Sequence, residues 1–452
     1  MSYNFKQFDR NTLFLMPPSV QDWLPENHLA RFIVEIVSQL DLHAFKSAYA
    51  GRGSKAYHPE MILALLFYGY ATGVHSSRKI EEATYDSVAF RYIAANTHPD
   101  HDTIASFRKR FLEELKYLFL QILKIAHEME ILKIGKISLD GTKIKANASK
   151  HKALSWQHAL KVEKQLKDEI EELMRLAEKA DAADSLNGVD IPEELSRRQD
   201  RITAITRARK EIERRAAQRY EKEKEAYEQK RSKRKANIEL TGKKPRGRDP
   251  KPPEPGPRKT DQMNLTDGES RIMPKAGKGF EQAYNAQAGV DVETMLIVEE
   301  HISQCPNDKK EIIHTLEELS SLPKGIGKVD TILSDAGYFS ESNVEACEAE
   351  HVKPYIATHR DYHNQTIKER LSQPDPIPDD ADPVVRMRHR LHTPLGRKLY
   401  AKRKSTVEPV FGIIKHVMRF RQFLLRGLDA VRGEWNLVCI AWNLKRMHIL
   451  KA

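Results

Sequence analysis

The sequence has few cysteines, and their spacing does not match a metal-binding or disulfide motif. Its 452 residues include three cysteines, Cys305, Cys347 and Cys439, which are far apart and form no C-x-x-C pair. This spacing argues against a zinc knuckle and a disulfide framework, and it suits a reducing compartment. We expect these thiols to be buried or incidental.

Long apolar runs are also missing. The longest, residues 61–71 (MILALLFYGYA), is too short for a bilayer and predicts a buried helix. The first residues, MSYNFKQFDR, lack the positive end and apolar run of a secretory signal. We therefore expect a cytoplasmic protein without a membrane partner.

Positive charge is what the sequence has in excess. Lys and Arg total 75 against 64 Asp and Glu, which gives a net charge of +11 and a pI near 9.2. Such a balance favours a polyanionic partner. With 40% hydrophobic residues, the chain is long enough for two or three domains with a sizeable core.

The first stretch with chemical interest is residues 136–146, KISLDGTKIKA. Ile137 and Leu139 alternate with polar residues, which predicts a half-buried strand. The apolar pattern stops at Asp140, which Gly141 follows, so we expect Asp140 at a strand end. Taken alone, an Asp-Gly pair is typical of a turn, and a functional role requires other carboxylates to converge on it.

Two later stretches supply such carboxylates. In residues 329–340, VDTILSDAGYFS, a short apolar strand ends at Asp335, and residues 400–420 predict a helix with Glu408 in its first turn. Two strand-end aspartates and a helix glutamate are typical of two-metal phosphoryl transfer, because hard divalent cations prefer carboxylate oxygens. Other acids near strand ends lack a following Ala-Gly-Tyr and are interpreted as surface acids: Asp267, Asp291, Asp308 and Asp330.

Glu408 also has a purely structural interpretation. Ser405-x-x-Glu408 fits a capping box, in which the glutamate would serve only backbone N–H groups. Lys415 and Arg419 lie on the same predicted helical stripe and could hold a terminal phosphate of DNA. Solvated cations are the alternative for both.

Residues 1–130 predict a helical DNA-binding domain. Short helices in tight succession between residues 76 and 111 suggest a helix-turn-helix. Its last helix would turn Ile104 and Phe107 inward and present polar side chains to phosphates or base edges: Ser106, Arg108, Lys109 and Arg110. An ordinary solvated helix is the alternative.

The rest of the chain predicts an α/β catalytic core that is interrupted after its first strand. We expect the core in residues 131–152 and 279–452, an inserted antiparallel helical hairpin in 153–240, and a mobile, Pro-rich basic linker in 241–278. The hairpin would serve dimerisation or nucleic-acid contact, and its basic end, KRSKRK, favours phosphate. Residues 360–399 read as a loop.

The sequence resembles a DDE-type transposase of a bacterial insertion sequence over nearly its whole length. The stretches that carry the resemblance are SLDGTKIKANAS, FEQAYNAQAGVD, LSDAGYFS, YAKRKSTVEPVFGIIK and, near the amino terminus, PDHDTIASFRKRF. The family signature of Tyr, Arg, Glu and Lys has its counterparts in Tyr400, Arg403, Glu408 and Lys415. Four residues separate Arg403 from Glu408, where the common pattern has three.

This resemblance implies a fold, a reaction and partners. The fold is an RNase H-like mixed sheet in which Asp140, Asp335 and Glu408 hold two Mg²⁺ ions, with Mn²⁺ as a substitute. The reaction cuts double-stranded DNA at terminal inverted repeats and joins the 3′ ends to target DNA. A homodimer on paired ends, at the nucleoid, is expected. A nuclease without strand transfer and a non-catalytic DNA-binding or structural protein are the alternatives.

Overall fold

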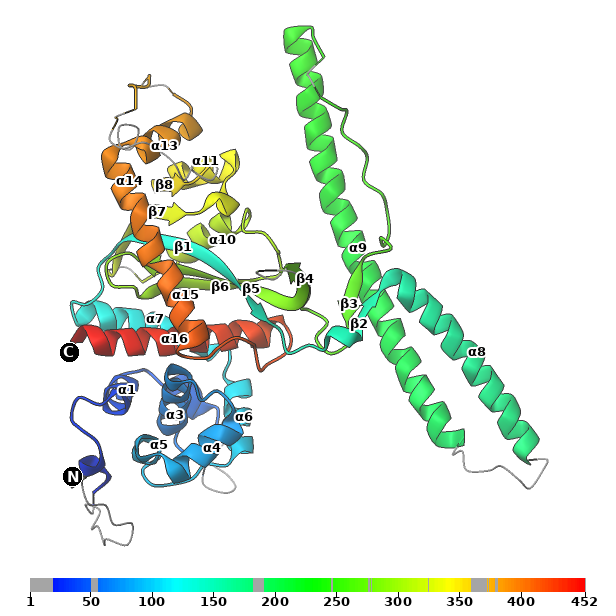
Figure 1. The fold of residues 1–452 in the computed structure, drawn as a ribbon, viewed down its shortest axis with the longest axis horizontal. Coiled ribbons are helices and arrows are strands. Elements are labelled where there is room, and N and C mark those ends of the chain that lie inside the picture. Colours follow the sequence, from blue (N-terminus) through cyan, green and yellow to red (C-terminus); the bar gives the residue numbers. More distant parts are fainter. Residues whose placement is uncertain are drawn as a thin grey trace, which may run out of the picture. The chain divides into compact units, whose positions relative to one another are not determined.

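The computed structural model describes residues 19–49, 56–181, 191–244, 247–274, 277, 279–323, 325–358, 372, 374–378 and 381–451. The chain divides into two compact units, unit 1 (Met1–Ile144 and Asn285–Ala452) and unit 2 (Lys145–Tyr284). Both crossings between the units lie within strands, one in β1 (Ile134–Lys145) and one in β5 (Phe280–Asp291). Figure 1 shows these elements along the chain.

Unit 1 begins with a layer of short helices around α3 (Pro59–Thr72). Pro59 opens α3 in its first turn, and Gly73 ends it with φ +85°, a left-handed conformation that glycine adopts without strain. Because α3 is apolar on every side, it is buried from Ile62 to Ala71. Its neighbours in sequence are η1 (Val20–Trp23), α1 (Leu29–Ser38), α2 (His43–Ser47), α4 (Ser77–Asp86), α5 (Val88–Ile93), α6 (His101–Arg110) and α7 (Glu114–Glu128).

A mixed sheet forms the centre of unit 1. Its strand order is β5-β1-β7-β8, with β6 (Ile297–Ser303) on the outer side of β5. The strands β7 (Gly327–Ser334) and β8 (Lys353–Ile356) run parallel to β1, whereas β6 runs antiparallel to β5. In unit 2, the first residues of β5 pair with β4 (Arg271–Pro274). The chain is therefore a mixed α/β protein.

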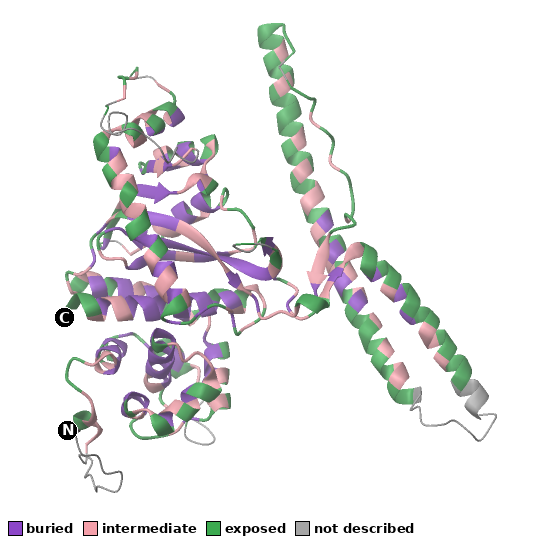
Figure 2. Ribbon diagram, viewed as in Figure 1, coloured by how far each residue is buried: buried purple, intermediate pink, exposed green. Residues whose placement is uncertain are grey.

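Helices cover this sheet. The last of them, α16 (Leu428–Lys451), packs against β6, α3 and α7, and Trp435 Nε1 donates to the carbonyl of Gln287 at 3.0 Å. Figure 2 shows the buried residues gathered in the sheet, α3 and α16. The other helices are α10 (Glu311–Ser320), η3 (Ala336–Tyr338), α11 (Glu341–Ala349), α13 (Pro383–His392), α14 (Pro394–Ala401), η4 (Lys402–Ser405) and α15 (Val407–His416).

Three sequence predictions about local structure are wrong. β1 runs through Asp140-Gly141 without a turn. The predicted loop of residues 360–399 contains α13 and the start of α14, although 359–371, 373, 379 and 380 lie outside the described residues. The predicted helix of residues 400–420 is divided into α14, η4 and α15. The division falls at Thr406, whose φ of −115° and ψ of −84° depart from helical values.

Besides β4 and the start of β5, unit 2 contains two long helices and a short two-stranded sheet. The sheet pairs β2 (Ala153–Ser155) with β3 (Gln262–Asn264) and follows η2 (Lys150–Lys152). The helices are α8 (Trp156–Asp181) and α9 (Ile191–Thr241). They pack together on a small core made of Leu154, Ala159, Leu166, Ile205 and Ala208. Within the described ranges of both units, every helix falls short of the combined length and apolarity needed to cross a membrane.

Candidate active site

Two predicted acids lie at matching positions of neighbouring parallel strands. The β1–β7 register pairs Ser138 with Leu333, so the same offset two residues later sets Asp140 beside Asp335. β7 ends at Ser334, and Asp335 caps the short helix η3 by accepting from Gly337 N–H at 2.8 Å. Asp140 therefore stands where its partner strand stops, although its own strand continues.

Gly141 serves close packing rather than a turn. A Cβ atom at this position would lie 2.1 Å from Gln287 Nε2, 2.7 Å from Asp308 Oδ1 and 2.9 Å from Asn285 Oδ1. No side chain other than hydrogen fits such distances. The Asp-Gly pair therefore lets β1 carry a carboxylate and leave room for polar side chains directly beside it.

Arg403 joins the first acid to the third. Its guanidinium donates from Nη1 to Asp140 Oδ2 and from Nη2 to Glu408 Oε1, each at 3.0 Å. The Arg403 side chain is 12% exposed and that of Glu408 is 46% exposed. The capping box is not formed, because Ser405 Oγ donates to the carbonyl of Lys402 and Glu408 lies against Arg403 instead.

The electrostatic surroundings of Asp140 disfavour its charge. Burial raises the pKa of Asp140 to about 6, Arg403 opposes this rise, and the negative charges of Asp335 and Asp308 add to it. The pKa of Arg403 is itself raised, since the charges of Asp140, Asp335 and Glu408 outweigh its desolvation. Excess negative charge of this kind is relieved by a cation.

Three of the acids interpreted as surface acids are not exposed: Asp267 and Asp291 are 2% and 1% exposed, and Asp308 is half-buried. Asp308 is the one whose charge acts on Asp140. Its Oδ1 accepts from Asn285 Nδ2 at 2.6 Å and from Gln287 Nε2 at 2.8 Å, and Lys143 Nζ lies 3.4 Å away. A signal was present: Asn285 and Gln287 stand two residues apart on β5, where neighbouring side chains are buried. Two amides on one face of a buried strand need polar partners.

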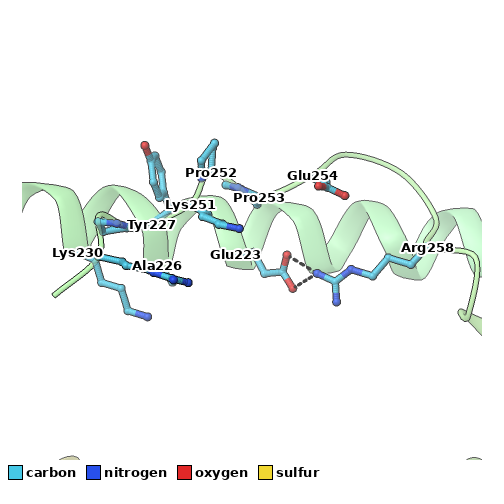
Figure 3. Close-up of a pocket in the computed structure, with 11 residues that line it drawn as sticks. Glu223, Ala226, Tyr227, Lys230, Lys251, Pro252, Pro253, Glu254 and Arg258 are labelled. Atoms are coloured by element: carbon cyan, nitrogen blue, oxygen red, sulfur yellow. Dashed lines mark hydrogen bonds and ion pairs between the residues drawn. The ribbon is translucent and has the colours of Figure 1, made fainter.

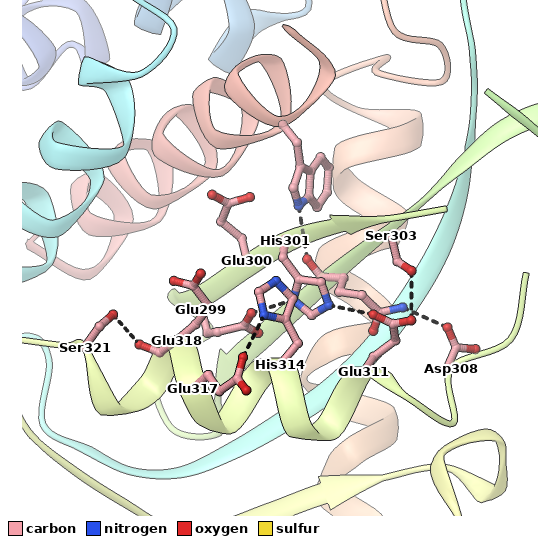
Figure 4. Close-up of polar contacts among 12 residues, drawn as sticks. Glu299, Glu300, His301, Ser303, Asp308, Glu311, His314, Glu317, Glu318 and Ser321 are labelled. Carbon is pink, nitrogen blue, oxygen red and sulfur yellow. Dashed lines mark hydrogen bonds and ion pairs between the residues drawn. The ribbon is translucent and has the colours of Figure 1, made fainter. Parts of the chain in front are cut away.

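A buried ionic cluster lies next to Asp308, where α10 begins. His301 bonds to Glu299 Oε1 through Nδ1 at 2.7 Å and to Glu311 Oε2 through Nε2 at 3.1 Å. Ser303 Oγ donates to the other oxygen of Glu311 at 2.8 Å. Figure 4 shows these side chains beside Asp308. Burial lowers the pKa of His301, but the two glutamates outweigh it and raise the pKa to about 10.

Two family models match the chain. The Transposase domain (DUF772) matches residues 18–110 and the Transposase DDE domain matches residues 251–444. The chain belongs to the DDE-type insertion-sequence transposases. The enzyme is therefore a metal-dependent catalyst of phosphoryl transfer on DNA. No curated protein and no solved structure matches the transposase.

The matched ranges cover part of the site. The Transposase DDE domain includes Asp335, Glu408, Asp308 and Arg403, whereas Asp140 precedes the matched range. Asp140 is therefore included in the candidate active site because of the strand register and its bond to Arg403.

The two predicted phosphate-binding cations of the transposase lie in different places. Lys415 is in the last turn of α15, where Nζ donates to Thr142 Oγ1 and to the carbonyl of Lys143 on β1. Arg419 lies beyond the end of α15 with φ +59°, so it does not share the stripe of Glu408. Gly412 has open space where a side chain would stand.

The predicted DNA-contacting residues of α6 differ in exposure. Ser106, Lys109 and Arg110 are exposed, whereas Arg108 is 7% exposed. The Arg108 guanidinium donates to Tyr70 OH at 2.9 Å and to the carbonyl of His75 at 3.1 Å. This placement gives Arg108 a packing role between α6 and α3, and we do not propose it as a DNA contact.

Proposed function

We propose that the transposase cuts double-stranded DNA at the terminal inverted repeats of its element and joins the freed 3′ ends to target DNA. In the first step, water attacks a phosphorus atom and the bond to the 3′ oxygen breaks, which leaves a 3′ hydroxyl and a 5′ phosphate. In the second, that hydroxyl attacks a target phosphodiester and displaces another 3′ hydroxyl. Both steps are in-line displacements that need no covalent enzyme intermediate.

The observation that carries this proposal is the convergence on Arg403. Asp140 and Glu408 are far apart in sequence, yet both bond to one guanidinium, and the strand register sets Asp335 beside Asp140. The strand order β6-β5-β1-β7-β8, with β1, β7 and β8 parallel, supports an RNase H-like core.

The donor set fits divalent magnesium. Asp140, Asp335 and Glu408 offer the hard carboxylate oxygens that Mg²⁺ and Mn²⁺ prefer, and the raised pKa of Asp140 marks a place where a cation is favoured. In the described residues, no three acidic, His or Cys side chains already stand in ligand geometry. Glu408, which bonds to Arg403 here, would be the third ligand of the set. When bound, two ions would activate the attacking oxygen and stabilise the leaving oxygen.

The chain's own residues would position the DNA. Arg403, once released from the acids, and Lys415 would hold the phosphate backbone near the site, and Arg419 is a further exposed cation after α15. Ser106, Lys109 and Arg110 would contact the terminal repeats from α6. A homodimer would hold the two element ends together.

Substitution of the acids tests the site. Asp140→Asn and Glu408→Gln should each reduce cleavage of an end-bearing duplex by about 10³-fold or more, with DNA binding retained. Asp330→Asn is the matched control, because Asp330 is an exposed acid on the same strand that leads to Asp335. Unchanged cleavage in both active-site variants would reject the proposed site.

Strand joining separates the transposase from a nuclease. A pre-cut end with a free 3′ hydroxyl, incubated with Mg²⁺ and target DNA, should become covalently joined to the target. Cleavage of intact ends without any joining of pre-cut ends would instead favour a nuclease.

A further inference from the structure

The second half of α9 has no core of its own. Ala216 is the last buried residue of this helix, and every described residue from 217 to 241 is exposed or half-buried. These residues form about 37 Å of helix at 1.5 Å per residue. Figure 2 shows the change along α9. Because apolar packing does not explain this stretch, its surface chemistry requires another account.

The cations of the two halves are used differently. In the first half, several arginines bond to acids of unit 2, among them Arg198 to Glu169 at 2.8 Å and Arg209 to Glu163. In the second half, several exposed cations form no ion pair within the described part of the chain: Lys222, Lys224, Lys230, Arg231, Lys233 and Lys235. Unpaired charges remain available to a partner.

The chain returns along α9 and covers one face of it. Arg258 Nη2 bonds to both oxygens of Glu223 at 2.9 and 3.0 Å, and Arg234 pairs with Asp249 at 3.1 Å. Arg219 Nη2 also donates to the carbonyl of Gly256 at 3.2 Å. The linker predicted to be mobile is thus held along α9 at residues 247–258. It covers the half-buried stripe of α9, which a partner helix would need to contact and which consists of Arg219, Glu223, Tyr227, Arg234 and Ile238.

A groove of about 710 Å³ lies between α9 and this returning segment. Figure 3 shows Tyr227 of the helix beside Pro252 of the segment, and Lys230 and Lys251 also line the groove. Glu223 is neutralised by Arg258, so the unpaired charges of the lining are mainly cationic: Lys230, Arg248 and Lys251.

The face of α9 beside this groove contains one acid, Glu223, which is paired with Arg258. Lys222, Ala226, Lys230, Lys233 and Asn237 follow one another at spacings of three or four residues, and therefore share one face. The other acids of the same stretch lie on another face: Glu221, Glu225, Glu228 and Glu239. Lys222, Lys230 and Lys233 are thus separated from these four acids around the helix.

We propose that Lys222, Lys230, Lys233, Arg248 and Lys251, the basic face, bind the phosphate backbone of double-stranded DNA. From Lys222 to Lys233 the helix extends about 16 Å, and one DNA strand presents a phosphate about every 3.4 Å along its axis. A helical protein partner is disfavoured, since the returning segment already covers the half-buried stripe. This inference rests on the proposed function for the presence of DNA, but the proposed function does not assign a DNA contact to unit 2.

A charge-matched pair of triple variants tests the basic face. One carries Lys230→Gln, Lys233→Gln and Lys251→Gln. The control carries Lys161→Gln, Lys164→Gln and Lys210→Gln, which remove three exposed lysines of unit 2 outside the basic face. Binding of a random 40-bp duplex is measured in EDTA at several salt concentrations, so that catalysis does not contribute. Circular dichroism checks that helix content is unchanged.

The basic-face variant should bind about 500-fold more weakly at 0.1 M salt, and the slope of log K against log salt should fall by about 3. The control should stay within about threefold of the unmodified chain. Equal losses of DNA affinity in both variants would show that binding depends only on the net charge, which would overturn the proposal. Unchanged DNA binding with an altered oligomeric state would assign the face to a protein partner and also overturn it.

The same samples distinguish this inference from the proposed function. At saturating DNA with Mg²⁺, the basic-face variant should still cleave end-bearing duplex, because its catalytic acids are intact. Weak binding with normal saturated cleavage supports the basic face. Absent cleavage in the unmodified chain would instead count against the proposed function alone.

Discussion

The acidic site on β1 and the basic face of α9 hold charge in opposite ways. At the site, the side chains of Asp140 and Asp308 are only 20% and 21% exposed, and each bonds to side chains that the fold places beside it. On α9, Lys230 and Lys233 are exposed and have no ion pair within the described residues. Buried, paired charges act one at a time and depend on geometry, whereas exposed charges act together and respond to salt. Single substitutions should therefore differ greatly in effect between the two regions.

The largest single effect should come from the buried His301. His301→Gln leaves Glu299 and Glu311 without their cation, and we expect a loss of about 3–5 kcal/mol in the free energy of unfolding at pH 7. Urea unfolding measures it. His58→Gln is the control, because His58 is 55% exposed and its pair with Glu60 is long, at 3.7 Å. A loss no larger than that of the control would contradict the claim that a single buried, paired charge has a large effect on stability.

The pH dependence of this effect has a definite sign. The folded pKa of His301, about 10, lies above its ordinary value of 6.5. The stabilisation by charged His301 is therefore complete below pH 6.5 and disappears as pH rises through 10. The difference between the unmodified chain and His301→Gln should shrink between pH 7 and pH 10.5. A constant difference would mean that the ring acts only by packing.

Gly141→Ala should have the next largest effect. A methyl group 2.1 Å from Gln287 Nε2 forces β1 or the amide to move, so cleavage should fall by about 100-fold. Gly135→Ala, on the same strand, is the control, because its nearest neighbour would be 3.8 Å away. Equal activity of the two variants would show that the site tolerates displacement of its polar neighbours.

Asp308→Asn should act mainly on metal affinity. It removes a negative charge near Asp140 and Asp335 but leaves an oxygen for Asn285 and Gln287. We expect half-maximal cleavage to need about ten times more Mg²⁺, as is typical when a neighbour of a metal ligand is changed. DNA binding in EDTA should not change. An unaltered Mg²⁺ titration would reduce Asp308 to a packing role.

The smallest effect should come from one exposed lysine. Lys233→Gln should weaken DNA binding about eightfold at 0.1 M salt and reduce the salt slope by about 1. Lys224→Gln, on the same helix but on the side of the acids, should change binding less than twofold. If both variants weakened DNA binding equally, DNA binding would not be confined to the basic face of the helix.

Sequence patterns reveal some parts of this molecule and miss others. The apolar residues of α3, α16 and the core strands predict those elements, because the residue type largely determines which side chains are buried. The family follows from short stretches around Asp335 and Glu408, and the two matched domains confirm it. The bond from Arg403 to Asp140 joins residues 263 positions apart, which no local pattern encodes.

The wrong predictions have physical causes. The sequence predicts that the first strand ends at Asp140, since the more common reason for glycine is its backbone freedom, whereas here three side chains fill the space that a Cβ would take. Asp308 was interpreted as a surface acid because its two amide partners are on β5, more than 20 residues earlier. Arg108 was predicted to face DNA, yet Tyr70 and His75 on a neighbouring segment draw it inward. Each error concerns a contact made by tertiary packing.

The position of unit 2 also has a consequence for synthesis on the ribosome. β1 and β5 are neighbours in the sheet, but the 140 residues of Lys145–Tyr284 are translated between them. At about 5–20 residues per second, β1 waits roughly 7–28 seconds for the strand that will pair with it. During that interval its apolar side chains, Ile137 and Leu139 among them, have no sheet to join. The nascent chain is therefore most vulnerable to aggregation, and most in need of a chaperone, before its catalytic strands have met.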